Sequence, residues 1–264
     1  MVILSIVSAK GGVGKTTLAA NIALALAQSR SVVAVDLDPQ NALRLHLGVA
    51  PHDIDGVGRA TLEARPWSSA AFKSSTPSLQ VVPYGELNEG DRDAFEVHLS
   101  SHPDWLVKGL QGLGLRDTDV VVIDTPPGPS LYQQQVLRAA HFVLAVVHAD
   151  AASYATIPAM ESLLERYCAN RDGCLGSAYL INNMNVGSAL SRDVVRVIRA
   201  GLGDRVVPGV VHQDESVREA LAFDQLVLQY APHSEASSDI AQVVRWLNQR
   251  LQPAFASRPQ VTRA

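Results

Sequence analysis

The sequence predicts an α/β fold in which a doubly wound, mostly parallel sheet is flanked by helices. Three observations lead to this prediction: short runs rich in valine, isoleucine and leucine recur along the chain, their hydrophobicity is continuous rather than alternating, and helical patterns lie between them. Continuous hydrophobicity is typical of strands that are buried on both faces. Strands that alternate with helices favour right-handed crossovers between parallel strands.

The expected elements follow one another along one domain, residues 1–252. The apolar runs that we expect to be strands lie at 2–8, 31–37, 79–85, 119–125, 142–149, 175–182 and 205–211. Helical periodicity is found at 15–29, 153–169, 191–202 and 238–251. The stretch 50–78 is the least periodic, and we expect loops and short helices there. Residues 253–264 contain two prolines and little periodicity, which predicts a flexible C-terminal tail.

Composition restricts the class of protein. The chain has 264 residues, of which 47% are hydrophobic and 18% charged, as is typical of a globular protein with a substantial core. The formal net charge of -4 provides no long-range attraction for nucleic acid or an anionic membrane. The apolar start lacks the basic region of a signal peptide, and no run approaches the roughly 20 apolar residues of a membrane-spanning helix. We therefore expect a cytoplasmic protein.

The two cysteines are separated by five residues. The spacing of Cys168 and Cys174 suits neither a disulfide framework nor the usual zinc pairs, and no other cysteine could complete a cluster. We interpret them as reduced thiols.

Residues 8–17 read SAKGGVGKTT and connect the first expected strand to the first expected helix. Glycines in this turn let successive backbone N–H groups point into one concavity, and the helix adds its positive N-terminal end. Lys15 is expected to reach the β and γ phosphates, and the Thr16 hydroxyl to ligate Mg²⁺. The expected nucleotide contacts are Gly11, Gly12, Val13, Gly14, Lys15, Thr16 and Thr17.

Lys10 marks a departure from the ordinary motif G-x-x-x-x-G-K-[ST], which has a glycine where this chain has Ala9. The pattern K-G-G-x-G-K-T-T resembles the deviant phosphate loop of the ParA/MinD family of ATPases. The resemblance implies an ATP-bound homodimer in which two subunits enclose two ATP molecules and Lys10 reaches the nucleotide of the other subunit. Such a charge acts as an arginine finger does during phosphoryl transfer. It also implies slow, dimer-dependent ATP hydrolysis, with catalytic roles for Lys10, Lys15 and Asp38.

Carboxylates end two of the expected strands. In the segment VDLDPQN, the resemblance implies that Asp36 lies near the Mg²⁺ shell and that Asp38 positions or activates the attacking water. The segment VVVIDTPPG at 120–128 ends a buried strand in Asp124, as the Walker-B element of such ATPases does, and its Pro-Pro-Gly segment is suited to sense the γ-phosphate. The expected metal ligands are Thr16, Asp36 and Asp124.

Two later segments are candidates for base recognition. The run LINN at 180–183 closes an expected strand, and relatives use an asparagine there to read the adenine edge, which implies a contact by Asn182. The segment VVHQDES at 210–216 aligns Asp214 with the acid of a P-x-D-like loop, although His212 replaces the proline. A surface loop without a ligand role remains an alternative for residues 212–214.

A narrower resemblance concerns the biological role. The stretches NALRLHLGV, LINNMNVGSALSRDVVRVI and VVHQDESVREALAFDQLVLQYAPHSEASSDIAQVVRWL resemble the BcsQ (YhjQ-type) family of bacterial cellulose synthase operons. The resemblance implies a role in assembling, localising or regulating the cellulose synthase secretion complex. The implied partners are a small BcsR-like subunit and other cytoplasmic components of that complex, with recruitment to the inner membrane through them.

Three alternatives stay open at this point. A ParA-type DNA- or cargo-partitioning ATPase needs a basic patch for DNA, which the net charge disfavours. A MinD-like membrane cycler needs a basic amphipathic C-terminal helix, and residues 253–264 do not resemble one. A scaffold that binds ATP and dimerises without hydrolysis would keep the same motifs.

Overall fold

The computed structural model describes residues 1–50, 52–169 and 171–256 and confirms the predicted α/β fold. In its seven-stranded sheet the order is β3-β4-β2-β5-β1-β6-β7, and every strand pair is parallel except β3 with β4. The strands are β1 Val2–Val7, β2 Val32–Asp36, β3 Phe72–Lys73, β4 Leu79–Val82, β5 Val120–Asp124, β6 Phe142–His148 and β7 Ser177–Asn182.

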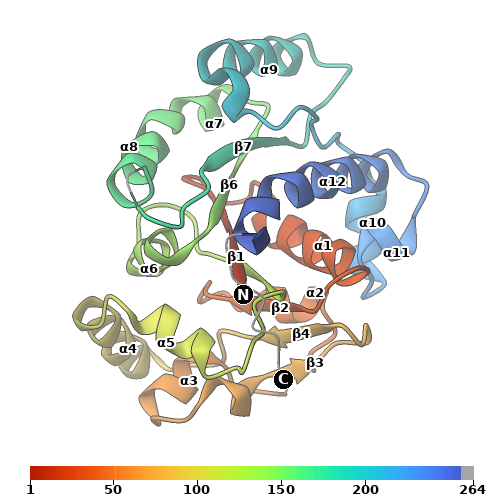
Figure 1. Cartoon of the computed structure of the whole chain (residues 1–264). Helices are drawn as coiled ribbons and strands as arrows, with labels where there is room; N and C mark the ends of the chain where they lie inside the picture. The colour runs from red at the N-terminus through yellow and green to blue at the C-terminus, as the bar shows by residue number, and fades with distance from the viewer. Residues whose placement is uncertain (51, 170, 257–264) are drawn as a thin grey trace.

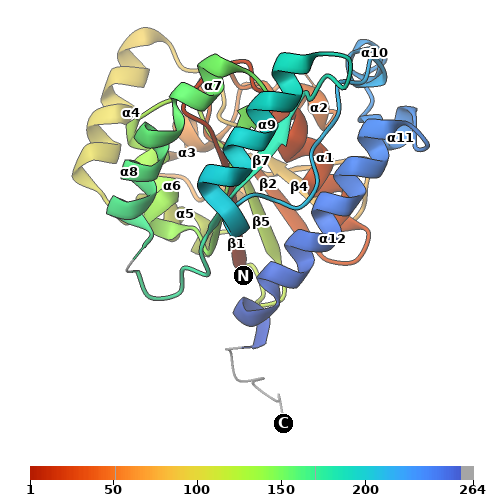
Figure 2. The ribbon, with the colours of Figure 1, turned by 90° about the horizontal axis from the view of Figure 1, so that it is seen from above.

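Helices cover both faces of this sheet (Figures 1 and 2). They are α1 Lys15–Ala27, α2 Leu43–His46, α3 Val57–Leu62, α4 Glu89–Ser101, α5 Trp105–Gln111, α6 Leu131–Ala139, α7 Ala151–Ala155, α8 Ile157–Tyr167, α9 Ala189–Leu202, α10 Ser216–Ala222, α11 Val227–Tyr230 and α12 Glu235–Ala256, with 3₁₀ turns η1 Trp67–Ala70 and η2 Gly203–Arg205.

Successive strand residues face two separate hydrophobic clusters. In β1, Leu4 and Ile6 pack with α1 and α12, whereas Ile3 and Val7 pack with α4, α6 and α8 on the other face. This alternation is expected because neighbouring side chains of a strand point to opposite faces. It explains the continuous hydrophobic runs, since both faces are covered.

The structure differs from the expected elements in three segments. Residues 205–211 form no strand: Val206 makes only an isolated bridge to Tyr179, because Pro208 has no N–H to continue a ladder. The helical run at 153–169 is divided into α7 and α8, with Pro158 in the first turn of α8. The segment expected as a tail begins inside α12, which continues to Ala256, and 257–264 lie outside the described residues.

The topology brings the carboxyl ends of the central strands to one edge. β1 lies between β5 and β6, and β2 pairs with β5 so that Asp36 and Asp124 are register partners. Ligands of open parallel sheets bind outside the carboxyl ends of the strands, where the loops to the next helices gather. The phosphate loop that follows β1 lies at this edge.

Candidate functional site

The phosphate loop has the backbone geometry that an anion-binding turn needs. Gly12 and Gly14 have φ values of 72° and 83°, in the left-handed region that glycine adopts without strain. Gly14 is also the N-cap of α1, and its position supplies no side-chain cap for the first turn. The N–H groups that begin α1 are therefore directed to a ligand site at the positive end of the helix.

Ser8 connects the loop to the segment that follows β5. Its hydroxyl donates to the Lys10 carbonyl at 2.7 Å, and its carbonyl accepts from the backbone N–H of Gly128 at 2.9 Å and from the Gln133 side chain at 3.3 Å. A Cβ at Gly11 would lie 3.6 Å from Cγ of Pro127. The phosphate loop and the Pro-Pro-Gly segment are thus in direct contact, as a γ-phosphate sensor requires.

Lys15 and three carboxylates converge beside the loop. The Lys15 side chain is buried, and desolvation lowers its pKa, while the nearby Asp124 and Asp38 carboxylates oppose that shift. Burial raises the pKa of Asp124 to about 7 against the effects of the Thr16 hydroxyl and Lys15. Burial also raises the pKa of Asp36, and the neighbouring Asp124 adds to this rise. The cluster concentrates negative charge that a bound cation would relieve.

The three carboxylates differ in the hydrogen bonds that their oxygens accept. Asp36 accepts from the backbone N–H of Asp38 at 2.9 Å and of Leu43 at 3.0 Å, so it holds the loop after β2 in place. Asp38 accepts from the N–H of Gln40 at 3.0 Å. Both oxygens of Asp124 are buried and accept no well-aligned hydrogen bond from the described residues, although the Thr16 hydroxyl and the Thr125 N–H lie close enough to lower the pKa of this carboxyl. A buried carboxylate without well-aligned partners is costly unless a cation binds it, so Asp124 fits Mg²⁺ best.

Lys10 points to a different part of the site from Lys15. Its ammonium lies 3.3 Å from Asp150, the residue that caps α7, and both side chains are about two-fifths exposed. His148 at the end of β6 lies 3.6 Å from the same carboxylate. Exposed pairs of this kind contribute little stability, so the contact can exchange for another. Asp150 and His148 could not be predicted as neighbours of Lys10, because neither belongs to a local sequence motif.

A cavity of about 270 Å³ adjoins the loop on its other side. Its lining includes Gly14, Asn182 and Asp214, so the structure brings both expected base-recognition segments to one cavity. The Asn182 amide donates to the Val13 carbonyl at 2.8 Å. The Asp214 oxygens accept from the backbone N–H groups of Ser216 at 2.9 Å and Ala236 at 3.0 Å, which fixes the starts of α10 and α12. A direct adenine contact by either residue stays a prediction.

His212 is held by α12 in the position where the resemblance expects proline. Its backbone N–H and ring Nδ1 both contact one oxygen of Asp239, at 2.9 and 2.8 Å. These two bonds restrict the loop that proline would otherwise restrict through its ring. The substitution therefore keeps the loop against the cavity by a different means.

Comparisons with known proteins agree with this geometry. The family model described as "Cellulose biosynthesis protein BcsQ" matches residues 1–247. The BcsQ protein of Escherichia coli K12 is 28% identical over 93% of this chain and 94% of its own length. MinD of Pyrococcus horikoshii, solved with Mg-ADP, superposes with a TM-score of 0.75 at 22% identity, over 96% of this chain and 98% of MinD.

The chain belongs to the BcsQ family. That family lies within the ParA/MinD-like ATPases, and the chain is homologous to partitioning ATPases such as Soj of Thermus thermophilus, with 28% identity over 95% of this chain and 97% of Soj. The family links the protein to cellulose biosynthesis. No helix among residues 1–50, 52–169 and 171–256 is long and apolar enough to cross a membrane.

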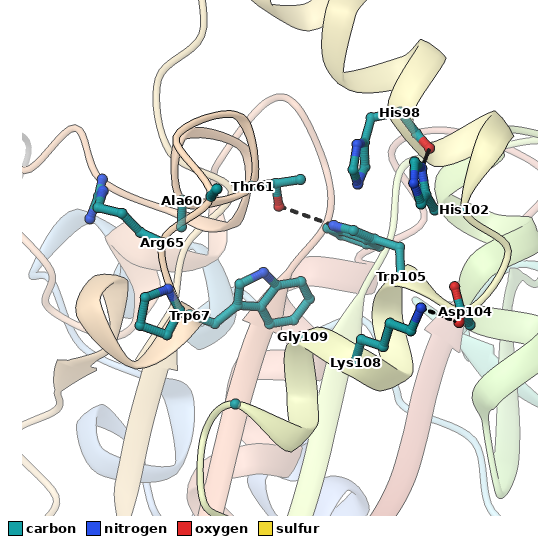
Figure 3. Close-up of a pocket in the computed structure, with 13 residues that line it drawn as sticks. Ala60, Thr61, Arg65, Trp67, His98, His102, Asp104, Trp105, Lys108 and Gly109 are labelled. Carbon is teal, nitrogen blue, oxygen red and sulfur yellow. Dashed lines mark hydrogen bonds and ion pairs between the residues drawn. The ribbon is translucent and has the colours of Figure 1, made fainter.

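A second cavity of this BcsQ-family chain, drawn in Figure 3, has no residue of the phosphate loop in its lining. It measures about 350 Å³ and lies between α3, α4 and α5, over the indole rings of Trp67 and Trp105. Four of its lining side chains form two polar pairs: the Trp105 indole donates a hydrogen bond to the Thr61 hydroxyl at 3.0 Å, and Lys108 forms an ion pair with Asp104 at 2.6 Å. This cavity has no glycine-rich turn like that of residues 11–14 in its lining.

Proposed function

We propose that this chain binds Mg·ATP, closes into a homodimer that encloses two nucleotides, and hydrolyses ATP slowly. The observation that carries the proposal is the buried Asp124 carboxylate, which accepts no well-aligned hydrogen bond from the described residues, beside Lys15 at the start of α1. A site for an uncharged ligand would have no use for a buried ammonium and a poorly satisfied carboxylate together.

Each residue of the site has a proposed task. Backbone N–H groups from Gly11 to Thr17 bind the phosphates, and Lys15 neutralises the β and γ oxygens. Thr16 and Asp124 would hold Mg²⁺, with Asp36 positioning the loop beside them; magnesium commonly uses one or two carboxylates together with phosphate oxygens. The bound ion would neutralise charge on the phosphates. Asp38 would orient the attacking water.

Lys10 is the residue on which dimerisation depends in this proposal. Within one chain it contacts Asp150 on the exposed rim, away from the Lys15 cluster. In the dimer, Lys10 would exchange that contact for the phosphates of the partner's ATP. The exchange replaces a solvent-screened pair by a charge-assisted contact in a closed site, where electrostatic interactions are stronger.

In the cell, the nucleotide cycle would assemble, localise or regulate the cellulose synthase secretion complex. The support is the family assignment over residues 1–247. The proposed partners are a small BcsR-like subunit and other cytoplasmic components of that complex. Pull-down from native cells tests this role: recovery of cellulose synthase components supports it, whereas tight, salt-sensitive binding to duplex DNA would favour a partitioning ATPase.

The dimer is tested by light scattering on an Asp38→Ala variant, which slows turnover while keeping the phosphate loop. We expect the mass to double with Mg·ATP, alone or with the BcsR-like subunit, and to stay monomeric with Mg·ADP. Adding Lys10→Ala should abolish the doubling while nucleotide binding remains. Lys108→Ala, which removes a lysine beside the second cavity, is the matched control.

Persistence of a monomer in every nucleotide state would contradict the proposed dimer. Equal loss of nucleotide binding in Lys10→Ala and Lys15→Ala would remove the separate role of Lys10. A stable ATP-bound dimer of the unmodified chain that releases no phosphate would replace the enzyme with a non-hydrolysing scaffold.

A further inference from the structure

A third cavity lies between the end of α9, the residues after it and the second half of α12. It measures about 550 Å³, which is in the size range of small-molecule sites. Arg199 from α9, Asp204 from η2, and Trp246 and Arg250 from α12 are in its lining. The lining thus combines two guanidinium groups and one carboxylate with an aromatic ring.

The two arginines of this cavity are held by contacts that do not neutralise them. The Arg199 guanidinium donates to the Pro208 carbonyl at 2.8 Å. The Arg250 guanidinium lies over the Trp246 ring, 5.1 Å from the ring centroid. In the part of the chain that the structure describes, neither guanidinium forms an ion pair with a carboxylate. Because a guanidinium has several N–H donors, both arginines keep donors for a ligand.

Trp246 restrains the position of Arg250. Its ring packs edge-on against Phe142, with the two ring centroids 5.8 Å apart, and it also packs against the hydrophobic core beneath α12. Arg250 follows one helical turn later, so the two side chains are on the same face of α12. Stacking on an indole holds a guanidinium without using its N–H donors. Arg250 is therefore positioned to donate to an anion.

This cavity lies at the opposite edge of the sheet from the phosphate loop. Phe142, which packs against Trp246, is the first residue of β6, whereas His148 at the other end of β6 lines the cavity beside the phosphate loop. Figure 2 shows the ends of α9 and α12 on the side of the molecule where β1 starts. Among the described residues, the two cavities share no lining residue. A ligand here would therefore not occupy the phosphate loop.

We propose that this cavity is an anion site that binds the phosphate group of a small molecule, either free phosphate or a phosphate ester. Guanidinium groups match phosphate oxygens in charge-assisted, often bidentate hydrogen bonds. The two arginines outnumber Asp204, so the lining has a net positive charge that favours a dianion. The cavity is larger than a single phosphate, which leaves room beside Trp246 for the organic part of an ester. The inference does not depend on the proposed ATPase cycle, because it rests on the groups that line this cavity.

Isothermal titration of the full-length chain with inorganic phosphate, phenyl phosphate and benzoate tests the ligand chemistry. A non-hydrolysable ATP analogue with Mg²⁺ keeps the phosphate loop occupied, and Lys15→Ala, which alters only that loop, should bind the probes as the unmodified chain does. We expect benzoate, a monoanion with the same ring, to bind at least about tenfold more weakly than phenyl phosphate. Tighter binding of phenyl phosphate than of phosphate identifies an ester as the ligand, and equal binding identifies free phosphate.

Two results of these titrations would overturn the proposal. One is the absence of binding by both phosphate probes, and the other is benzoate binding as tight as that of phenyl phosphate. Failure of the ATP analogue to bind would instead concern the phosphate loop, because the analogue is titrated separately.

Arginine variants test whether the cavity holds the phosphate. Arg199→Gln and Arg250→Gln should each weaken phenyl phosphate binding about tenfold, because each removes a charge-assisted contact. Arg196→Gln in α9 and Arg245→Gln in α12 are matched controls, since both arginines are exposed and neither lines the cavity. Equal losses in all four variants would show attraction to surface charge in general and would overturn the site.

Tryptophan fluorescence locates the bound anion. Of the three tryptophans in the chain, Trp67 and Trp105 line the cavity between α3, α4 and α5, and Trp246 lines this one. Inorganic phosphate does not absorb in this range, so we expect it to change the emission of the unmodified chain. The change should be absent in Trp246→Phe, although titration still detects binding. A response that persists in Trp246→Phe would place the anion elsewhere and contradict the proposal.

Discussion

The two sides of the nucleotide cavity are built in different ways. The phosphate side comes from ten consecutive residues, 8–17, together with carboxylates at the ends of β2 and β5, and the Asp124 oxygens accept no well-aligned hydrogen bond from the part of the chain that the structure describes. The base side, where we propose that adenine binds, comes from segments near residues 182, 212 and 240. Its polar side chains already hold the fold, since Asn182, His212 and Asp214 all bind other protein groups.

Because of this difference, we expect the phosphate side to determine the affinity for ATP and the base side to keep the segments around the cavity in place. Backbone N–H groups at a helix start bind phosphate with no further arrangement, because their direction follows from the helix itself. The base side must first keep its segments together, and its side chains do so with their own donors and acceptors. Substitutions on the phosphate side should therefore reduce binding, whereas those on the base side should first reduce stability.

The largest effect is expected at Lys15. Lys15→Ala removes the buried ammonium that neutralises phosphate oxygens and should weaken ATP binding about 100-fold, as losing a charge-assisted contact does. Isothermal titration with Mg·ATP measures the loss, and thermal unfolding shows whether the chain remains folded. Lys108→Ala serves as the control that should bind ATP normally. Retained affinity in Lys15→Ala would mean that the backbone alone holds the phosphates.

The phosphate side could be predicted from the sequence because its information is local. A strand, three glycines and a helix start follow one another, so spacing alone specifies the turn. The carboxylates at the ends of β2 and β5 were expected from the family resemblance, and the sheet explains why they lie together: the two strands are parallel neighbours, and Asp36 and Asp124 are in register.

Contacts between segments that are distant in the sequence could not be predicted from local motifs. Lys10 and Asp150 are 140 residues apart, and nothing near either residue indicates the other. The run at 205–211 has the composition of a strand, but Pro208 interrupts its pairing beside β7. The role of Asp214 depends on the start of α12 lying beside the cavity, where the Ala236 N–H donates to the Asp214 carboxylate. Such roles follow from packing rather than from motif or composition.

An intermediate effect is expected at the two left-handed glycines. Gly12→Ala introduces backbone strain with no atom within 4 Å of the new Cβ, and should weaken ATP binding roughly tenfold. Gly14→Ala adds a contact of 2.5 Å with the Asn182 amide, which must then leave Val13, so its loss should be larger. In the double variant Gly14→Ala/Asn182→Ala the contact is absent, so its ATP affinity, measured by titration, should return to that of Gly12→Ala. A double variant no better than Gly14→Ala would show that the two sides are not coupled through Asn182.

The smallest change in affinity is expected at Asp214. Asp214→Asn keeps the side-chain volume but weakens the oxygen acceptors for the Ser216 and Ala236 N–H groups. The free energy of unfolding should therefore fall by about 1 kcal/mol, as when a helix-capping side chain is lost. The affinity for ATP should change at most a few-fold. Denaturant unfolding and titrations with ATP and GTP measure the two effects. Glu215→Gln, whose exposed carboxylate pairs only with Arg218 among the described residues, is the matched control. A large loss of ATP affinity with unchanged stability would instead place Asp214 against adenine, and the base side would then bind its ligand as directly as the phosphate side does.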